Sequence, residues 1–236
     1  MTTTMHASAR EMRHMVGRYL HARRCPAFAV NAVRDAILAA QAEGFDAVSE
    51  MERIRDRYPA ARTSLAVSAD AGGPVLDGAG TPAPILAPAL VDELALALAA
   101  GETRVRVRGV PGIAMIDALH DYAAVRGVAF EFAAEGDDAA TLAVSTRTRF
   151  PVEPAAGAAG PSMERALREG YELGIEQFWR LFHESNEALT PDSEVSRRHA
   201  GSQLYDEHGN LIGEVSEETY LHLRSQAGDP SRAVLA

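Results

Sequence analysis

The sequence predicts an α/β protein, with an α+β arrangement as the alternative, in which helices and a mixed sheet share 236 residues. Apolar residues recur at helical spacing over the first sixty residues, and four later segments alternate with period two. A proline- and glycine-rich break then precedes a second helical region. Hydrophobic residues make up 47% of the chain, which is enough for a sizeable core.

Three helices are expected to form an N-terminal layer. Ser8 and Glu11 have the spacing of a capping box at the start of the first helix. The second helix is expected to end at Gly44, because glycine readily adopts the left-handed cap conformation. The third is expected to start after the capping residue Asp46 and to end before Pro59, since the residue before a proline avoids helical geometry.

A mixed sheet of about four strands with crossover helices is expected to follow. The strands are predicted at 63–68, with Val67 inward, and at 103–108, 128–132 and 141–145. Helices at about 88–100 and 113–126 separate them, which predicts two right-handed crossovers and a final hairpin turning at 135–138. The segment 69–84 is long for a connection and rich in glycine and proline, so we interpret it as a mobile loop or a lid.

The expected domain organisation has three parts. Residues 1–150 form the α/β body, and 151–161 form a Pro/Gly/Ala linker. Residues 162–236 form an arm that packs on the body or on a partner subunit. Within this arm, a long amphipathic helix at 163–189 is expected to precede a hairpin of 203–205 with 211–215.

Composition excludes several chemistries. The net charge is −10 and all 23 basic residues are arginine, so the chain has no lysine for a Schiff base, for pyridoxal phosphate or for a phosphate-binding loop. The arginines are scattered, so neither nucleic acid nor an anionic membrane is an expected partner. No signal peptide or long apolar run is evident, and we expect a cytoplasmic location.

The single cysteine, Cys25, excludes an internal disulfide and a cysteine-based metal centre. It is expected to pack as a small apolar group rather than to act as a nucleophile. His183 and Glu187 stand four residues apart, as in metal-binding helices, but glutamate replaces the second histidine of that motif, and we favour a solvated helix end. Neither a metal nor a cofactor is predicted, and the familiar catalytic templates such as G-x-S-x-G are absent.

The densest group of reactive side chains lies late in the chain. In this group Arg197 and Arg198 have the chemistry to hold a carboxylate or phosphate by paired hydrogen bonds. His199 or Glu194 would then donate or accept a proton. The competing interpretation is a polar loop that faces water. The candidate catalytic residues are His199 and Glu194, and the candidate substrate-binding residues are Arg197, Arg198, Ser193 and Ser196.

Two further patterns have a structural explanation that we favour. Gly170 and Gly174 would let a neighbouring helix approach closely, and this is expected to be a fold onto the body rather than a dimer seam. Alternating arginines at 104, 106 and 108 are expected on a solvated face of the sheet.

Two resemblances follow from these residues. The chain resembles a bacterial family of unknown function in the order of three parts. These are the helices Glu11 to Arg24 and Ala32 to Gly44, then Gly109-Val110-Pro111, and then Pro191-x-Ser193-Glu194-x-Ser196-Arg197 with Gly201 and Asp206. The first fifty residues are also similar to the helical start of the malate and lactate dehydrogenases that lack a Rossmann fold. Those enzymes carry Ser-His-Gly where this chain has Ala47-Val48-Ser49, so we do not infer dehydrogenase activity from this similarity.

Two functions from different classes follow. The first is a small-molecule metabolic enzyme, or a catalytic subunit, that binds an anionic carboxylate-type metabolite. The second is a non-catalytic subunit that docks on a partner enzyme or on another copy through its C-terminal helix. The sequence leaves open whether the chain is an enzyme, and an oligomer or partner subunit is expected in either case.

Overall fold

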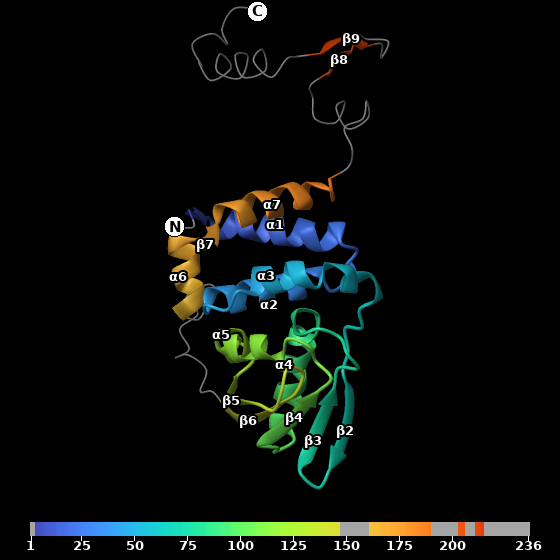
Figure 1. Ribbon diagram of the computed structural model, residues 1–236, viewed down its shortest axis with the longest axis vertical. Coiled ribbons are helices and arrows are strands. Elements are labelled where there is room, and N and C mark those ends of the chain that lie inside the picture. Colours follow the sequence, from blue (N-terminus) through green and yellow to red (C-terminus); the bar gives the residue numbers. More distant parts are fainter. Residues whose placement is uncertain (1–2, 147–160, 190–202, 206–210, 215–236) are drawn as a thin grey trace, which may run out of the picture. The chain divides into compact units, whose positions relative to one another are not determined.

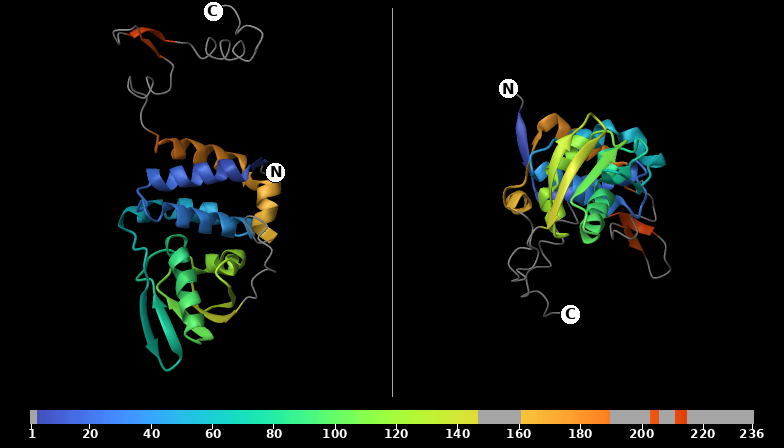
Figure 2. Two further views of the ribbon diagram at one scale, coloured as in Figure 1. Left: turned by 180° about the vertical axis from the view of Figure 1, so that it is seen from behind. Right: turned by 90° about the horizontal axis from the view of Figure 1, so that it is seen from below.

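The computed structural model describes residues 3–146, 161–189, 203–205 and 211–214. The chain divides into two compact units, Met1–Ala188 and Leu189–Ala236. The first unit combines helices with a mixed five-stranded sheet, which confirms the α/β class. Its elements lie in layers, with helix α7 on α1, then α2 and α3, and then α4 with the sheet (Figures 1 and 2).

The N-terminal helices are confirmed as α1 (Ala9–Ala22), α2 (Val30–Ala42) and α3 (Ala47–Arg53). Both hydrogen bonds of the capping box are present, since the Ser8 side chain accepts from the Glu11 N–H and Glu11 accepts from the Ser8 N–H. Asp46 caps α3 by accepting the N–H of Ser49. Helix α3 ends before Pro59, as predicted, and Pro59 itself lies inside a short 3-10 helix, η1 (Arg55–Ala60).

The sheet contains one more strand than the sequence predicts. Its order is β2-β3-β4-β6-β5, in which β3 and β4 are parallel and the other neighbours are antiparallel. Helix α4 (Ala83–Ala99) connects β3 to β4, while η2 (Ile113–Ala118) and α5 (His120–Ala124) connect β4 to β5. The predicted hairpin between the last two strands is confirmed. The strands are β2 (Ala66–Asp70), β3 (Gly73–Asp77), β4 (Arg104–Arg108), β5 (Val128–Ala134) and β6 (Ala140–Thr146).

The interpretation of 69–84 as a mobile loop or lid is wrong. This segment contains β3, whose Val75 and Leu76 are buried and paired with the strand β4. The prediction that Val67 points inward is also wrong, since 58% of its surface is exposed. Strand β2 is the edge of the sheet and all five of its residues are exposed, so alternation there does not mark a buried face.

The long helix expected at 163–189 is divided in two. Helix α6 (Pro161–Glu169) ends at Gly170, which adopts a left-handed conformation with φ of 84°. Strand β7 (Tyr171–Gly174) then pairs antiparallel with an N-terminal strand, β1 (Thr4–Ala7), before α7 (Ile175–Asn186) begins. A Cβ atom at Gly170 would lie 2.6 Å from the carbonyl oxygen of Ala7. Gly170 therefore precedes a strand and Gly174 ends it, so the two do not form a helix seam.

The second unit contains a short antiparallel hairpin of β8 (Gln203–Tyr205) and β9 (Leu211–Glu214), as predicted. Apart from Pro161, the expected linker at 151–161 lies outside the described residues, and its linker character stays a prediction. The described part of the chain holds no helix that is both long and apolar enough to cross a membrane.

Candidate functional site

The site residues predicted from the sequence fall where the structure gives no description. Their proposed roles in anion binding and proton transfer stay predictions. The residues outside the described ranges are Ser193, Glu194, Ser196, Arg197, Arg198 and His199.

The other reactive side chains considered above have structural roles. Cys25 is buried, and burial raises the pKa of its thiol to about 11, so it packs as a protonated, apolar group. Glu187 forms an ion pair with Arg23 at 3.0 Å, so this carboxylate has a structural partner and is not set aside with His183 for a metal. No cluster of three or more histidine, cysteine or acidic side chains that could hold a metal occurs among the residues that the structure describes.

Two of the alternating arginines on β4 are likewise paired. Arg106 forms an ion pair with Asp70, and Arg108 contacts Asp77 at 2.9 Å. These pairs link β4 to the β2–β3 hairpin. The pKa of both aspartates lies below its ordinary range. The main cause is the hydrogen bond from Arg106 at Asp70, and the N–H of Ala79, with a smaller effect of Arg108, at Asp77. The arrangement stabilises the solvated face of the sheet, where the arginines were expected, rather than forming an anion site.

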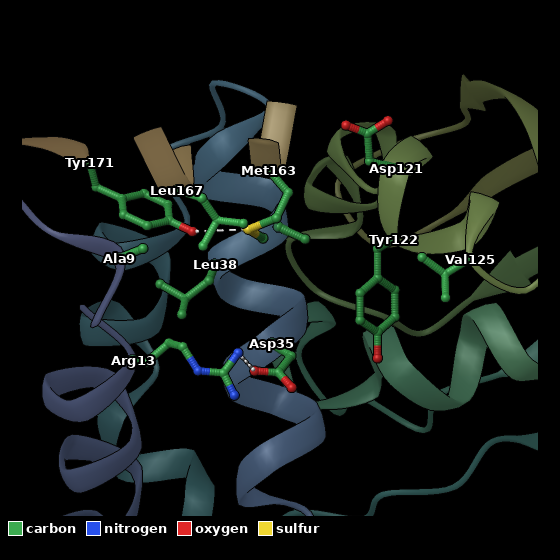
Figure 3. Close-up of a pocket in the computed structure, with 11 residues that line it drawn as sticks. Ala9, Arg13, Asp35, Leu38, Asp121, Tyr122, Val125, Met163, Leu167 and Tyr171 are labelled. Carbon is green, nitrogen blue, oxygen red and sulfur yellow. Dashed lines mark hydrogen bonds and ion pairs between the residues drawn. The ribbon is translucent and has the colours of Figure 1, made fainter. Parts of the chain in front are cut away.

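A pocket of about 210 Å³ opens between the helical layer and the C-terminal elements of the first unit. Figure 3 shows its lining side chains converging from α1, α2, α5, α6 and β7. Segments more than 150 residues apart in the sequence therefore build one site. The lining residues are Ala9, Arg13, Asp35, Leu38, Ala39, Asp121, Tyr122, Val125, Met163, Leu167 and Tyr171.

Most of the pocket wall is apolar. Leu38 forms part of the wall from α2, and Met163 and Leu167 contribute from α6. Val125 and Leu167 are exposed large apolar residues at this site. A concave apolar surface that water reaches favours a ligand with an apolar part, because such a ligand removes that surface from water.

One end of the pocket carries charge. The Arg13 guanidinium lies 3.4 Å from the Asp35 carboxylate, and the same carboxylate oxygen is 2.8 Å from Arg34. Arg34 also donates to Asp35 through Nε at 2.9 Å and to the side-chain oxygen of Asn31. Two guanidinium groups thus share one carboxylate, and Arg13 makes the longer contact. Arg13 consequently keeps donors for a further anion.

The opposite wall is fixed by backbone hydrogen bonds to two carboxylates. Asp121 accepts the N–H of Ser162 at 2.9 Å, which orients the start of α6. Glu43 accepts the N–H groups of Asp121 at 2.7 Å and His120 at 3.2 Å, which orients the start of α5. Burial raises the pKa of Glu43 above its ordinary value. The Tyr171 hydroxyl donates to the sulfur of Met163 at 3.5 Å across the pocket (Figure 3).

The class of protein that this arrangement defines is an α/β protein with a partly apolar, arginine-bearing pocket in its helical layer. No family model and no curated protein matches the sequence. A solved structure of a dehydrogenase from Sinorhizobium meliloti is similar with a TM-score of 0.54 at 11% identity, covering 78% of this chain and 100% of that chain. A malate dehydrogenase from Pyrococcus horikoshii OT3 has a TM-score of 0.40 at 10% identity, covering 94% and 89%.

The likeness to the Sinorhizobium dehydrogenase is one of fold. At the place where the non-Rossmann malate and lactate dehydrogenases carry Ser-His-Gly, this chain has Ala47 and Val48, both fully buried in the first turn of α3. These side chains contribute to the core and bring no imidazole to a site. Catalytic groups are therefore not inferred from this segment.

Proposed function

We propose that this protein is a small-molecule metabolic protein that binds a compact carboxylic acid in the pocket between α1, α2, α5, α6 and β7. The observation that carries the proposal is the placement of the Arg13 guanidinium at one end of a mostly apolar pocket, whose two lining carboxylates, Asp35 and Asp121, already have partners within the chain. A carboxylate would pair with Arg13, and an apolar body would lie against Leu38 and Leu167. The proposal keeps the anionic ligand predicted from the sequence but assigns it to other arginines.

Pocket size limits the ligand to a short molecule. An engineered apolar cavity of about 150 Å³ holds benzene, and this pocket measures about 210 Å³. One aromatic ring or a short branched chain with a carboxylate matches that volume. Long-chain acids and nucleotides exceed it, since pockets for larger ligands start at about 300 Å³.

A role in metabolism draws support from the fold, because a dehydrogenase has a similar one. An enzyme that acts on a small organic acid is the activity in best agreement with both the fold and the charged end of the pocket. The pocket provides the groups that would bind such an acid, and the proposed activity is a reaction of small-molecule metabolism.

Titration calorimetry with phenylacetate, 3-methylbutanoate and acetate tests the proposal. We expect the two acids with apolar bodies to bind and acetate to give no measurable heat. Phenylacetamide, which lacks the charge, should bind more weakly than phenylacetate. Arg13→Gln should weaken phenylacetate about tenfold, because a hydrogen bond to a charged group contributes about 1.5 kcal/mol or more.

Matched variants locate the site. Arg10→Gln changes an exposed arginine on the same helix α1 outside the pocket, and should leave binding unchanged. Leu167→Ser should weaken binding, whereas Leu96→Ser, at a similar exposure of 62% against 59%, should not. If binding survives Arg13→Gln and is lost on replacing Arg197 and Arg198 by alanine, the late arginine cluster is the binding site and the pocket is not.

A further inference from the structure

We propose that two copies of the chain associate through helix α7, packed antiparallel about a twofold axis close to Trp179. This inference concerns a different surface from the pocket and does not rest on the ligand proposed above.

One face of α7 is already used within the chain. Phe178, Leu181 and Ser185 are buried, and the helix packs along α1. Most of the apolar face that was predicted to dock on a partner is therefore buried in the core of the chain itself. Any docking surface on α7 must lie beside this face.

A flank of α7 remains apolar and accessible. Ile175, Trp179 and Phe182 are 37%, 48% and 37% exposed. Their spacing of four and three residues places them on one side of the helix. Three large apolar side chains aligned in this way form a stripe, and covering this stripe would lower the free energy because it removes apolar surface from water.

The aromatic rings of this stripe are already ordered. Trp179 contacts Phe178 and Phe182 edge-to-face, with ring centroids 5.3 and 5.7 Å apart, and His183 packs against Phe182 at 5.6 Å. Side chains held by such contacts lose little conformational entropy on association. The stripe is therefore suited to recognising a rigid surface.

Ion pairs fix the rotation of α7 and so keep the stripe outward. Arg23, which caps the C-terminal end of α1, contacts Glu184 at 2.8 Å, and Arg180 of α7 contacts Glu52 of α3 at 2.8 Å. Gln177 also donates to Ser49 at 2.9 Å. These contacts engage the flank opposite to Ile175 and Trp179, so within the described residues no ion pair involves the stripe.

The stripe is complementary to itself when two copies run antiparallel. With Trp179 on the twofold axis, Ile175 meets Phe182 of the other copy, and Glu176 meets His183 of the other copy. Each contact then occurs twice, as a closed dimer requires. In a parallel pair about a twofold axis, the flanks that carry Glu176 and His183 would lie on opposite sides of the seam, so this contact would not form.

The contact is small, so the dimer is expected to be weak. A helix of 12 residues is about 18 Å long. Three apolar side chains from each copy bury well below the roughly 1,600 Å² of a standard interface. We expect a dissociation constant in the micromolar range and a rapid exchange between monomer and dimer.

Analytical ultracentrifugation of the full chain over a hundredfold range of concentration tests this inference. Trp179 is the only tryptophan of the chain, so its emission should shift to shorter wavelength as the dimer forms. Phe182→Glu should abolish both signals, while Leu96→Glu on α4 should change neither. A chain that stays monomeric throughout, or a dimer that persists in Phe182→Glu, would overturn the proposal.

Disulfide trapping tests the antiparallel geometry. Trp179→Cys should cross-link to itself under mild oxidation. Ile175→Cys and Phe182→Cys should each remain largely uncross-linked alone but should cross-link when mixed. The native chain is the control, because its Cys25 is buried. Efficient self-linkage of Ile175→Cys would contradict the antiparallel arrangement.

Discussion

Gly78 lies where the turn after β3 approaches the turn after β4. Its N–H donates to the carbonyl of Arg108 at 2.9 Å. A Cβ atom at this position would lie 2.5 Å from Val110 Cγ2 and 2.8 Å from Leu86 Cδ1. Both neighbours are fully buried, so they have little room to move. Close packing therefore requires glycine here.

We expect Gly78→Ala to destabilise the fold by about 2–3 kcal/mol, as overpacking of a dense core commonly does. Gly17→Ala is the matched control, because its new methyl group would meet only the Arg34 side chain at 3.6 Å. Inside helix α1 this change should stabilise by about 0.5–1 kcal/mol. Urea denaturation measures both, and equal effects of the two variants would refute the packing argument.

Arg13 illustrates which site residues the sequence could not identify. In the sequence it is one of many scattered arginines on an ordinary amphipathic helix. It becomes a candidate only because α1 lies beside α2, where Asp35 is shared with Arg34. Local sequence density favoured Arg197 and Arg198 instead, since reactive residues cluster there. Convergence of distant segments leaves no such local signal.

Among the elements, α7 is tied to the helical layer by partly buried ion pairs. Arg23 bridges Glu184 and Glu187, while Arg55 reaches Glu184 at 3.5 Å. The side chains of Arg23 and Glu184 are largely withdrawn from water, so the loss of one leaves the other poorly compensated. These pairs join α7 to α1 and η1.

Glu184→Ala should therefore lower the free energy of unfolding by about 1–2 kcal/mol. Glu164→Ala is the control, because its partner Arg168 is one turn along the exposed face of α6, and such pairs contribute about 0.3–0.5 kcal/mol. Hydrogen exchange should also show faster exchange of α7 amides in Glu184→Ala. If exchange speeds up equally in both variants, the ion pairs do not anchor α7.

Element prediction succeeded where the pattern was local. The capping box at Ser8, the cap at Asp46 and the hairpin of β5 with β6 follow from short-range spacing. Prediction failed for β7, because Tyr171–Gly174 is flanked by residues of helical periodicity and becomes a strand only by pairing with β1. Strand β3 was missed because it begins with Gly73 and Pro74, which are typical of loops, and becomes a strand by pairing with β4.

For the molecule as a whole, buried tyrosines make the free energy of unfolding depend on pH in the alkaline range. Burial raises the pKa of Tyr19 and of Tyr171 to about 12. In the unfolded chain a tyrosine has a pKa of about 10, so between these values the folded state binds more protons. The stabilisation is complete below about pH 10 and is lost as the pH rises toward 12.

Each of these tyrosines should make the free energy of unfolding fall by about 1.4 kcal/mol per pH unit within this window. Urea denaturation at pH 9, 10 and 11 measures the slope. Tyr171→Phe should reduce it while costing about 1 kcal/mol or less at pH 8, because among the described residues the hydroxyl makes only the weak hydrogen bond to Met163. An unchanged slope in this variant would show that Tyr171 does not titrate on unfolding.

The sequence by itself determined the α/β class, the N-terminal helical layer and the chemistries excluded by the absence of lysine. These conclusions depend on composition and on spacing within one segment, which are fully present in a single chain. Only the tertiary structure decided the pairing of β1 with β7, the pocket around Arg13 and the exposed stripe on α7. Each of them depends on which distant segments pack together, and the free energy of that packing is shared by the whole core.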